Sequence, residues 1–300
     1  MWTRCMRSSL PKTKTACDRN IYFLKSVEER LKRSRVPAAS SEAEQLVRHF
    51  SGIDRLDFFT GKKAVTSRAK RSVESALRLR LKGKPLSYVL KEAEFFGFKF
   101  FVSADTLIPR PETEVLAEEA LRVLEKRITP EILDIGTGTG CLAVSLTIQR
   151  TDCRMTALDV SSKALKIARK NINFHGLSQK VNLVKSDLFS HFGPEKKNFW
   201  DLIVTNPPYV ASEDFPGLSK EVFSEPRLAL DGGPKGFSVI DAILEKAPYY
   251  LKVGGRLLME IGDGQAPALK KKILKDKRFS NLYFAKDLNG IDRVLAVQKS

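Results

Sequence analysis

Ile132-Leu133-Asp134-Ile135-Gly136-Thr137-Gly138-Thr139-Gly140 is an apolar run that ends in three closely spaced glycines. The run predicts a buried strand, and the glycines predict a tight turn that opens a helix. Glycine tolerates positive φ and lets a ligand approach the main chain closely. A strand, a glycine-rich turn and a helix in this order are typical of an open α/β sheet that binds a nucleotide at its carboxyl edge.

The chain around this stretch alternates between predicted strands and predicted helices from Pro130 onward. Asn289-Gly290 predicts a tight hairpin between the last two strands, which makes an otherwise parallel sheet mixed. We therefore predict an α/β fold with a seven-stranded, Rossmann-like sheet. The expected helices lie at about 139–149, 162–174, 236–251 and 265–276, and the expected strands at 131–135, 154–159, 181–184, 201–205, 254–261, 281–286 and 292–298.

The first part of the chain has the pattern of a small helical domain. Apolar residues recur at helical spacing, most clearly over 67–81, where Arg and Lys occupy the opposite face. Ser41 and Glu44 have the spacing of a capping box, which predicts a helix over 42–50. Residues 94–102 are then dense in phenylalanine and are interrupted by Gly97, which predicts a β-hairpin with its turn near Gly97.

These patterns divide the chain into four parts. Pro111 presets the first turn of a helix that runs to about Arg127, so the α/β domain is expected to begin there. The parts are a tail or targeting segment over 1–20, a basic helical substrate-docking domain over 21–90, a hairpin and hinge over 91–110, and the α/β domain over 111–300.

Polar residues lie near the ends of four of the predicted strands, namely Asp134, Asp159, Asp187 and Asn206. Because the carboxyl ends of parallel strands meet at one edge of the sheet, we expect these side chains around one pocket. Asp159 follows Gly136 by 23 residues, where a carboxylate can accept both hydroxyls of a ribose. Asp187 can accept from an adenine amino group, with Leu188 and Phe189 against the two faces of the ring. The pocket therefore suits an adenosine.

The spacing of the glycines indicates which adenosine compound binds. Nicotinamide nucleotides use G-x-G-x-x-G to hold a pyrophosphate at a helix N-terminus, whereas this chain has G-x-G-x-G preceded by Asp134. A carboxylate there would repel a diphosphate but can orient water or the amino group of a methionine moiety. We therefore predict S-adenosylmethionine as a methyl donor and S-adenosylhomocysteine as its product. The predicted donor-binding residues are Asp134, Gly136, Thr137, Gly138, Thr139, Gly140, Asp159, Asp187, Leu188 and Asn206.

Asn206-Pro207-Pro208-Tyr209 ends the predicted strand 201–205, because neither proline has an N–H to donate. The Asn206 side-chain oxygen and the Pro207 carbonyl can accept the two hydrogens of a planar NH2, while Tyr209 covers its face. Holding both N–H groups turns the nitrogen lone pair toward a methyl donor and stabilises the positive charge that develops. We predict methyl transfer to a planar nitrogen, with Asn206, Pro207 and Tyr209 as catalytic residues and Pro208 as a further substrate contact.

The charge is unevenly distributed along the 300 residues. Residues 1–110 contain 24 Lys and Arg against 11 Asp and Glu, a net charge of +13. The remaining residues contain 28 against 24, a net charge of +4. This difference predicts an anionic partner for the front part of the chain, such as a nucleic acid or a ribonucleoprotein, although a basic front half also serves solubility.

The composition narrows the class of protein further. No run of about 18 apolar residues is present, so we expect no membrane span. The cysteines, Cys5, Cys17, Cys141 and Cys153, form no C-x-x-C pair, so we expect neither a metal site nor a disulfide framework. We predict a monomer in the cytoplasm. Residues 1–20, with five basic residues and one acid, predict a mitochondrial or plastid location instead if they are a transit peptide.

Several motifs resemble those of the release factor glutamine methyltransferases, the HemK family. The resemblance spans about residues 80–300 and excludes the far N-terminus, which is similar only in being helical. Leu188 departs from it, because some members have an aromatic residue against the adenine at this position. The similar segments are 85–88, 94–95, 108–114, 136–140, 206–209, 225–233 and 291–294.

The resemblance implies N5-methylation of the glutamine in the Gly-Gly-Gln tip of class 1 peptide chain release factors. It implies a class I S-adenosylmethionine-dependent methyltransferase domain, with the donor on Gly136 to Gly140, Asp159 and Asn206. It also implies a protein substrate bound by 206–209, to which we add Arg110 from the 108–114 segment.

Three other functions remain open at this point. An adenine-N6 DNA methyltransferase would present the same NH2, but only about 26 residues lie between Tyr209 and the next helix, too few for a region that reads sequence. A non-catalytic nucleic-acid or ribosome binder would not need the polar residues at the strand ends. An oxidoreductase is disfavoured by the glycine spacing.

Overall fold

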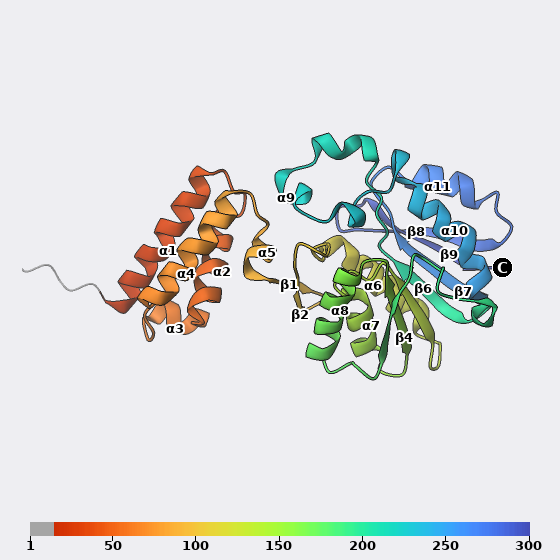
Figure 1. Ribbon diagram of the computed structural model, residues 1–300, viewed down its shortest axis with the longest axis horizontal. Helices are drawn as coiled ribbons and strands as arrows, with labels where there is room; N and C mark the ends of the chain where they lie inside the picture. The colour runs from red at the N-terminus through yellow and green to blue at the C-terminus, as the bar shows by residue number, and fades with distance from the viewer. Residues whose placement is uncertain (1–14) are drawn as a thin grey trace, which may run out of the picture. The chain divides into compact units, whose positions relative to one another are not determined.

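The computed structural model describes residues 15–300 and divides into two units, one that ends at Leu90 and one that spans Lys91–Ser300 (Figure 1). Of the predicted tail or targeting segment, residues 1–14 lie outside the described residues. Residues 16–20 of that segment already belong to the first helix, α1, which spans Ala16–Arg33 and is capped by Thr15. None of the helices between residues 15 and 300 combines the length and apolar character that a membrane span requires.

The first unit is entirely helical in its described part. After α1 it contains α2 (Ala39–Ser51), α3 (Arg55–Thr60), α4 (Ser67–Leu81) and α5 (Leu86–Leu90). These helices enclose a core that includes Val27, Leu31, Leu46, Phe58, Val73 and Leu77. A buried ion pair joins the Arg80 guanidinium to the Glu42 carboxylate at 2.6 Å, so α2 and α4 are also fixed to each other by charge. The predicted helix over 67–81 is confirmed.

The predicted start of the second helix is wrong. Helix α2 begins at Ala39, its N-cap is Ala38, and no side chain caps it. Ser41 lies inside the helix and accepts a hydrogen bond from Gln45 instead of a backbone N–H. Ala39 is buried in the core of the unit, and this burial extends the helix beyond the capping signal. The capping box of this unit lies at Thr15 and Asp18, which open α1.

The second unit contains the seven-stranded mixed sheet, which confirms the predicted fold class. Its strand order is β5-β4-β3-β6-β7-β9-β8, with β7–β9 and β8–β9 antiparallel. The chain runs outward from β3 to β5 and returns to β6, so the order reverses between β3 and β6. The strands are β3 (Glu131–Ile135), β4 (Arg154–Asp159), β5 (Val181–Lys185), β6 (Trp200–Thr205), β7 (Leu251–Glu260), β8 (Phe279–Lys286) and β9 (Asp292–Lys299).

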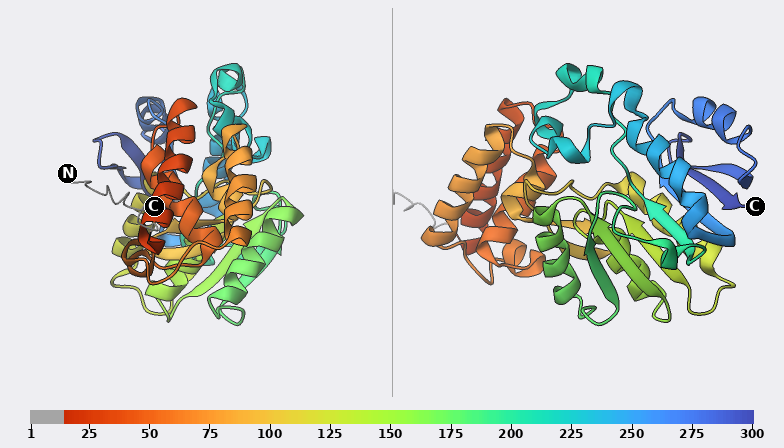
Figure 2. Two further views of the ribbon diagram at one scale, coloured as in Figure 1. Left: turned by 90° about the vertical axis from the view of Figure 1, so that its left-hand side faces the viewer. Right: turned by 45° about the vertical axis from the view of Figure 1, so that its right-hand side comes forward.

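Helices cover both faces of this sheet (Figure 2). Alternate residues of the strands enter two cores, as Ile132 does on one side and Leu133 on the other. The first core includes side chains of α6 (Pro111–Leu124), α7 (Cys141–Gln149) and α8 (Ser162–Phe174). The second includes those of α10 (Ser238–Tyr250) and α11 (Ala266–Ile273). Short helical turns complete the unit, namely η1 (Pro194–Lys196), η2 (Ser212–Gly217), α9 (Lys220–Phe223), η3 (Arg227–Ala229) and η4 (Pro234–Gly236).

The predicted hairpin is present as β1 (Glu92–Phe95) and β2 (Phe98–Phe101), with its turn at Phe96 and Gly97. The fully buried amide of Asn171 on α8 fixes its far end. Asn171 accepts from the Phe101 N–H at 2.7 Å and donates to the Phe101 carbonyl at 2.9 Å. It also donates to the Thr139 carbonyl at 2.8 Å, so one side chain joins the hairpin to the glycine-rich turn.

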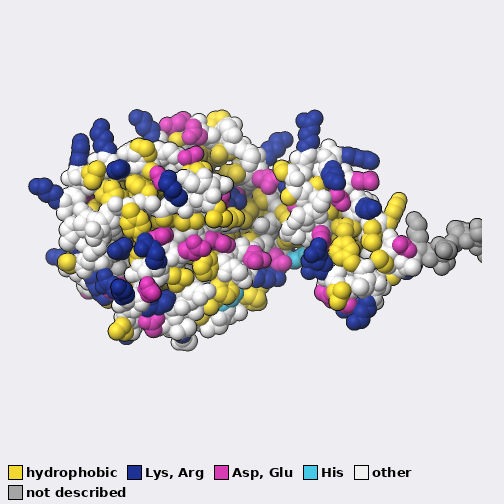
Figure 3. All heavy atoms as spheres, turned by 180° about the vertical axis from the view of Figure 1, so that it is seen from behind, with side chains coloured by type: hydrophobic (Ala, Val, Ile, Leu, Met, Phe, Trp, Pro, Cys, Tyr) yellow, Lys and Arg dark blue, Asp and Glu magenta, His cyan; other side chains and the backbone are white. Residues whose placement is uncertain are grey.

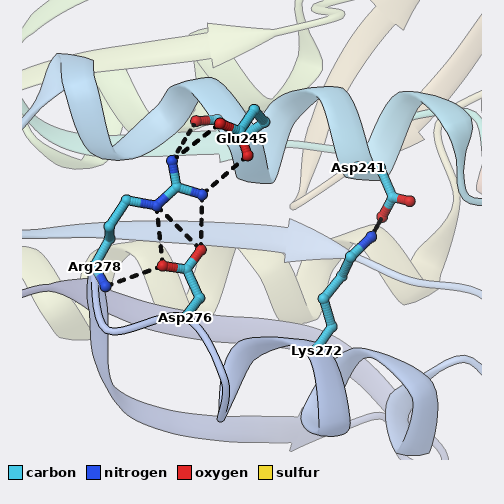
Figure 4. A network of polar contacts seen from close by, with 5 residues as sticks. All are labelled: Asp241, Glu245, Lys272, Asp276 and Arg278. Atoms are coloured by element: carbon cyan, nitrogen blue, oxygen red, sulfur yellow. Dashed lines mark hydrogen bonds and ion pairs between the residues drawn. The ribbon is translucent and has the colours of Figure 1, made fainter.

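An exposed ion-pair network joins α10 to α11 and to the turn before β8 (Figure 4). The Arg278 guanidinium lies 2.8 Å from Asp276 and 3.0 Å from Glu245, and Lys272 pairs with Asp241. Because water screens such pairs, we expect Arg278→Ala to lower the free energy of unfolding by no more than about 1 kcal/mol. Urea unfolding measures this change, and a loss of several kcal/mol would contradict the assignment of a peripheral role.

Candidate active site

A cavity of about 250 Å³ lies in the second unit at the carboxyl ends of β3, β4 and β6. One water needs about 10–15 Å³, so the space suits an organic ligand. It lies where the strand order reverses, the usual ligand position in open α/β sheets. Its wall includes residues 105–110, 135–139, 158–161, 186–188, 205–208, 226 and 228–229.

The glycine-rich turn forms one wall of the cavity. Gly136 and Gly138 have positive φ, and a Cβ added to Gly136 would meet no atom within 4 Å. The space above this backbone is therefore free for a ligand. The Gly138 N–H donates to Asp159 Oδ2 at 2.9 Å, and the Thr137 N–H donates to the Leu158 carbonyl at 2.8 Å. The turn is thus held against the end of β4.

Asp159 lies at the end of β4 and on the cavity wall. Its Oδ1 accepts from the Ser161 N–H at 2.8 Å, and its Oδ2 accepts from Gly138. Burial raises the pKa of this carboxyl, and the backbone donors oppose the rise. Each oxygen retains a lone pair, so the carboxylate can also accept two hydroxyl groups of a ligand. This arrangement fits the ribose of an adenosine.

Four residues predicted for the site do not line the cavity, namely Asp134, Gly140, Phe189 and Tyr209. Asp134 is fully buried within β3, and its Oδ2 accepts from the Thr137 hydroxyl at 2.6 Å. Burial raises its pKa to about 7. Gly140 caps α7 against α8, where a Cβ would lie 3.4 Å from Ala168. The other predicted donor-site residues line the cavity, and Thr137 and Thr139 are nearly inaccessible.

The expected pair of side chains around the adenine ring is only half present. Asp187 and Leu188 line the cavity, whereas Phe189 is fully buried in the core behind it. Phe189 stacks on Tyr250 with ring centroids 4.6 Å apart. The prediction for Phe189 is therefore wrong, because the chain turns at Leu188, which has positive φ, and directs the next side chain inward.

The 206–209 segment follows β6 and adjoins the glycine-rich turn. The register pairs Ile135 of β3 with Thr205 of β6, and the Thr205 hydroxyl donates to the Ile135 carbonyl at 2.8 Å. Asn206, Pro207 and Pro208 line the cavity. Asn206 Nδ2 donates to the hydroxyl of Thr113, at the start of α6, at 3.0 Å. The Tyr209 hydroxyl donates to Glu260 at 3.1 Å.

Glu260 and Thr113 are site residues that sequence reasoning missed. Glu260 ends β7, and the register pairs Met259 with Thr205, so Glu260 lies beside Asn206. It is 1 % exposed and accepts from the Thr113 hydroxyl at 2.6 Å. Burial raises its pKa to about 7. The signal was present, because Glu260 is another polar residue near the end of a predicted strand.

Arg110 lies on the cavity wall, but its guanidinium is bound to Glu225. Glu225 also accepts from the Ile108 N–H at 3.0 Å, and its side chain is 1 % exposed. Burial raises the pKa of Glu225, opposed by these partners. The carboxylate therefore joins two walls of the cavity, the hinge over 108–110 and the loop over 225–231.

We expect Glu225→Gln to loosen this wall, because a side-chain amide can accept from only one of the two donors and presents its NH2 to the other. The loss in the free energy of unfolding should be about 1–3 kcal/mol. The Michaelis constant for the acceptor should rise. Calorimetric unfolding and steady-state kinetics measure both effects, with the exposed Glu195→Gln as control. Unchanged values for both would show that Glu225 does not hold the wall.

Comparisons with known proteins show the family to which this chain belongs. The PrmC N-terminal domain matches residues 23–90, and the methyltransferase small domain matches residues 113–276. The release factor glutamine methyltransferase of Chlorobaculum tepidum is 38 % identical over 263 residues, covering 85 % of this chain and 88 % of that protein. The chain belongs to the release factor glutamine methyltransferases. The member from Leptospira interrogans is 34 % identical over 290 residues, covering 94 % of this chain and 99 % of that protein.

The fold of this chain is also similar to that of a solved structure. The catalytic domain of hMettl16, in complex with the MAT2A 3′UTR hairpin 6, covers 77 % of this chain and 81 % of its own with a TM-score of 0.55. At 16 % sequence identity this similarity concerns the fold alone. Membership of the family makes the chain an S-adenosylmethionine-dependent methyltransferase, and the open backbone at Gly136 and the carboxylate of Asp159 fit that donor.

Proposed function

We propose that the enzyme methylates the N5 amide nitrogen of the glutamine in the Gly-Gly-Gln motif of class 1 peptide chain release factors. The observation that carries the proposal is the register of β3, β6 and β7. It sets the glycine-rich turn, Asn206 and Glu260 at neighbouring strand ends. This arrangement supports a donor site and a clamp for a planar nitrogen in one cavity, and membership of the family supports a release factor as the acceptor.

The donor is assigned to one end of this cavity. Gly136 and Gly138 leave their backbone open to it, Asp159 accepts from its ribose, and Asp187 and Leu188 adjoin its adenine. When bound there, S-adenosylmethionine supplies an electrophilic methyl group. Asp134 and Gly140 act from behind the wall, by fixing Thr137 and the start of α7.

The acceptor amide is assigned to Asn206 and Pro207. Asn206 Oδ1 and the Pro207 carbonyl accept its two N–H groups, and Pro208 continues the wall. This grip orients the nitrogen lone pair, and fixing the reactants in attack geometry can supply about 7–11 kcal/mol. The transfer forms one N–C bond and breaks one S–C bond, and one amide proton leaves to water. Arg110 and Tyr209 act on the substrate through the shape of this end of the cavity.

The proposal also covers the partners of the enzyme and its compartment. The helical unit docks the release factor, and any contact with nucleic acid is incidental. In the face shown in Figure 3, Lys and Arg side chains are dispersed among acidic and apolar ones. We propose a monomer in the cytoplasm, or in a mitochondrion or plastid if residues 1–20 are a transit peptide.

Mass spectrometry of a release factor after incubation with the enzyme and donor tests the proposal. We expect a gain of one CH2 on the peptide that contains Gly-Gly-Gln, and no gain when its glutamine is replaced by alanine. Duplex DNA in the same reaction is the competing acceptor. Methyl label on DNA alone would overturn the proposal in favour of an adenine-N6 methyltransferase.

A further inference from the structure

Asn206 and Pro207 form the proposed clamp for the acceptor amide. A chain of hydrogen bonds lies behind this clamp and joins three elements. Asn206, after β6, donates to Thr113 on α6 at 3.0 Å, and Thr113 donates to Glu260 on β7 at 2.6 Å. Thr113 is 3 % and Glu260 1 % exposed, so water does not compete with these bonds. Tyr209 donates to the other oxygen of Glu260 at 3.1 Å.

Glu260, at one end of this chain of hydrogen bonds, determines which group donates in each bond. An ionised carboxylate can only accept, so Glu260 requires the Thr113 hydroxyl to donate to it. That hydroxyl has one hydrogen, so toward Asn206 it can only accept. Asn206 must then present its NH2 to Thr113, which leaves Oδ1 on the opposite side of the planar amide. This is the side on which an acceptor N–H needs an oxygen.

We propose that Glu260 is a positioning residue for methyl transfer, which acts through Thr113 to hold Asn206 with its oxygen toward the acceptor amide. The inference rests on the proposed function for the identity of the acceptor. Glu260 takes no chemical step, because Thr113 and Asn206 lie between its carboxylate and the reacting atoms. The same carboxylate also accepts from the Tyr209 hydroxyl, which lies behind the cavity wall.

Protonation of Glu260 would remove the constraint, since a carboxylic acid can donate to Thr113 and allow the chain to reverse. Burial raises its pKa to about 7, the bonds from Thr113 and Tyr209 and the charge of Arg293 oppose the rise, and Glu112 adds to it. Arg293 itself is paired with Asp287 at 3.0 Å. The carboxylate form therefore dominates above about pH 7, and the Asn206 orientation is lost as the pH falls through that value.

The test compares Thr113→Val with Thr113→Ser. Valine keeps the shape of threonine without the hydroxyl, so we expect kcat to fall by at least about tenfold, the effect of one lost buried hydrogen bond. Serine restores the hydroxyl and should keep kcat within about threefold of wild type. Thr147→Val is the matched control, because Thr147 is equally buried but donates within α7 to Ala143. Thermal unfolding and calorimetric donor binding exclude a folding defect.

The pH dependence of kcat/KM in Glu260→Gln distinguishes a positioning role of Glu260 from a purely structural one. Wild-type kcat/KM should rise from about pH 6 to about pH 8, one unit either side of the raised pKa. Glu260→Gln should flatten this rise. The difference between the two profiles is the informative quantity, because burial also raises the pKa of Asp134 to about 7. In the Thr113→Val background Glu260→Gln should add little, because both substitutions break one chain.

Two results would overturn the inference. One is wild-type kcat in a folded, donor-binding Thr113→Val variant, and the other is equal impairment of the valine and serine variants. Failure of the proposed function looks different, because wild-type enzyme would then leave the release factor unmodified. If methyl label appeared on DNA instead, the same variants would be compared on that acceptor.

Discussion

Asn206→Ala is expected to abolish most methyl transfer and to lower donor affinity far less than turnover. The substitution removes the oxygen that accepts an acceptor N–H and the NH2 that donates to Thr113 at 3.0 Å. Loss of one preorganised polar group of this kind lowers kcat by about 10²–10³. Single-turnover assays on a release factor measure the loss, and calorimetry measures the donor affinity. Asn206→Asp should be as severe, because it keeps the shape but places a negative charge beside the buried Glu260.

The control for this prediction is Asn182→Ala, which truncates an exposed asparagine on β5. It should leave turnover unchanged. Turnover near the wild-type rate in both Asn206→Ala and Asn206→Asp would rule out the amide clamp.

Asp159→Ala is expected to produce the opposite pattern, with donor affinity lost first. Its carboxylate fixes the N–H groups of Gly138 and Ser161 at 2.9 and 2.8 Å, and by our assignment accepts both ribose hydroxyls. Hydrogen bonds to a charged group contribute about 1.5–3 kcal/mol each, so the dissociation constant should rise by at least about 100-fold. Titration calorimetry with S-adenosylmethionine measures this rise.

Asp159→Asn tests how much donor affinity one remaining acceptor oxygen supports. An asparagine keeps one acceptor oxygen and should recover part of the donor affinity. Asn206→Ala serves as the reciprocal comparison, because it should impair turnover more than donor binding. Unchanged donor affinity in Asp159→Ala would place the ribose elsewhere in the cavity.

The sheet was predictable from the sequence because its strands are short apolar runs separated by strong turn signals. The predicted strand 131–135 and helix 162–174 agree with β3 and α8 residue for residue. The insertion of β9 between β7 and β8 was not predicted, since hairpin signals fix which strands pair but not where the pair joins a sheet. The start of α2 was missed because burial of Ala39 overrode a local capping pattern.

Most of the predicted donor-site residues meet at one cavity because polar residues at strand ends identify a sheet edge. The rule does not say which side chains reach the surface of that edge. Asp134 is one residue short of the end of β3 and is buried, and Phe189 turns into the core. Thr113 and Glu225 lie far from Asn206 and Arg110 in sequence, so only the folded chain reveals their contacts.

The buried Asn171 amide couples donor binding at the glycine-rich turn to the ordering of the hairpin end. It holds the end of the hairpin at Phe101 and the glycine-rich turn at Thr139, and the hairpin begins two residues after Leu90, the last residue of the helical unit. Whatever free energy donor binding contributes to ordering that turn must also stabilise the hairpin end, and a ligand that orders the hairpin must raise donor affinity equally. We expect slower hydrogen exchange at the Phe101 N–H when donor is present, and Asn171→Ala should uncouple the two.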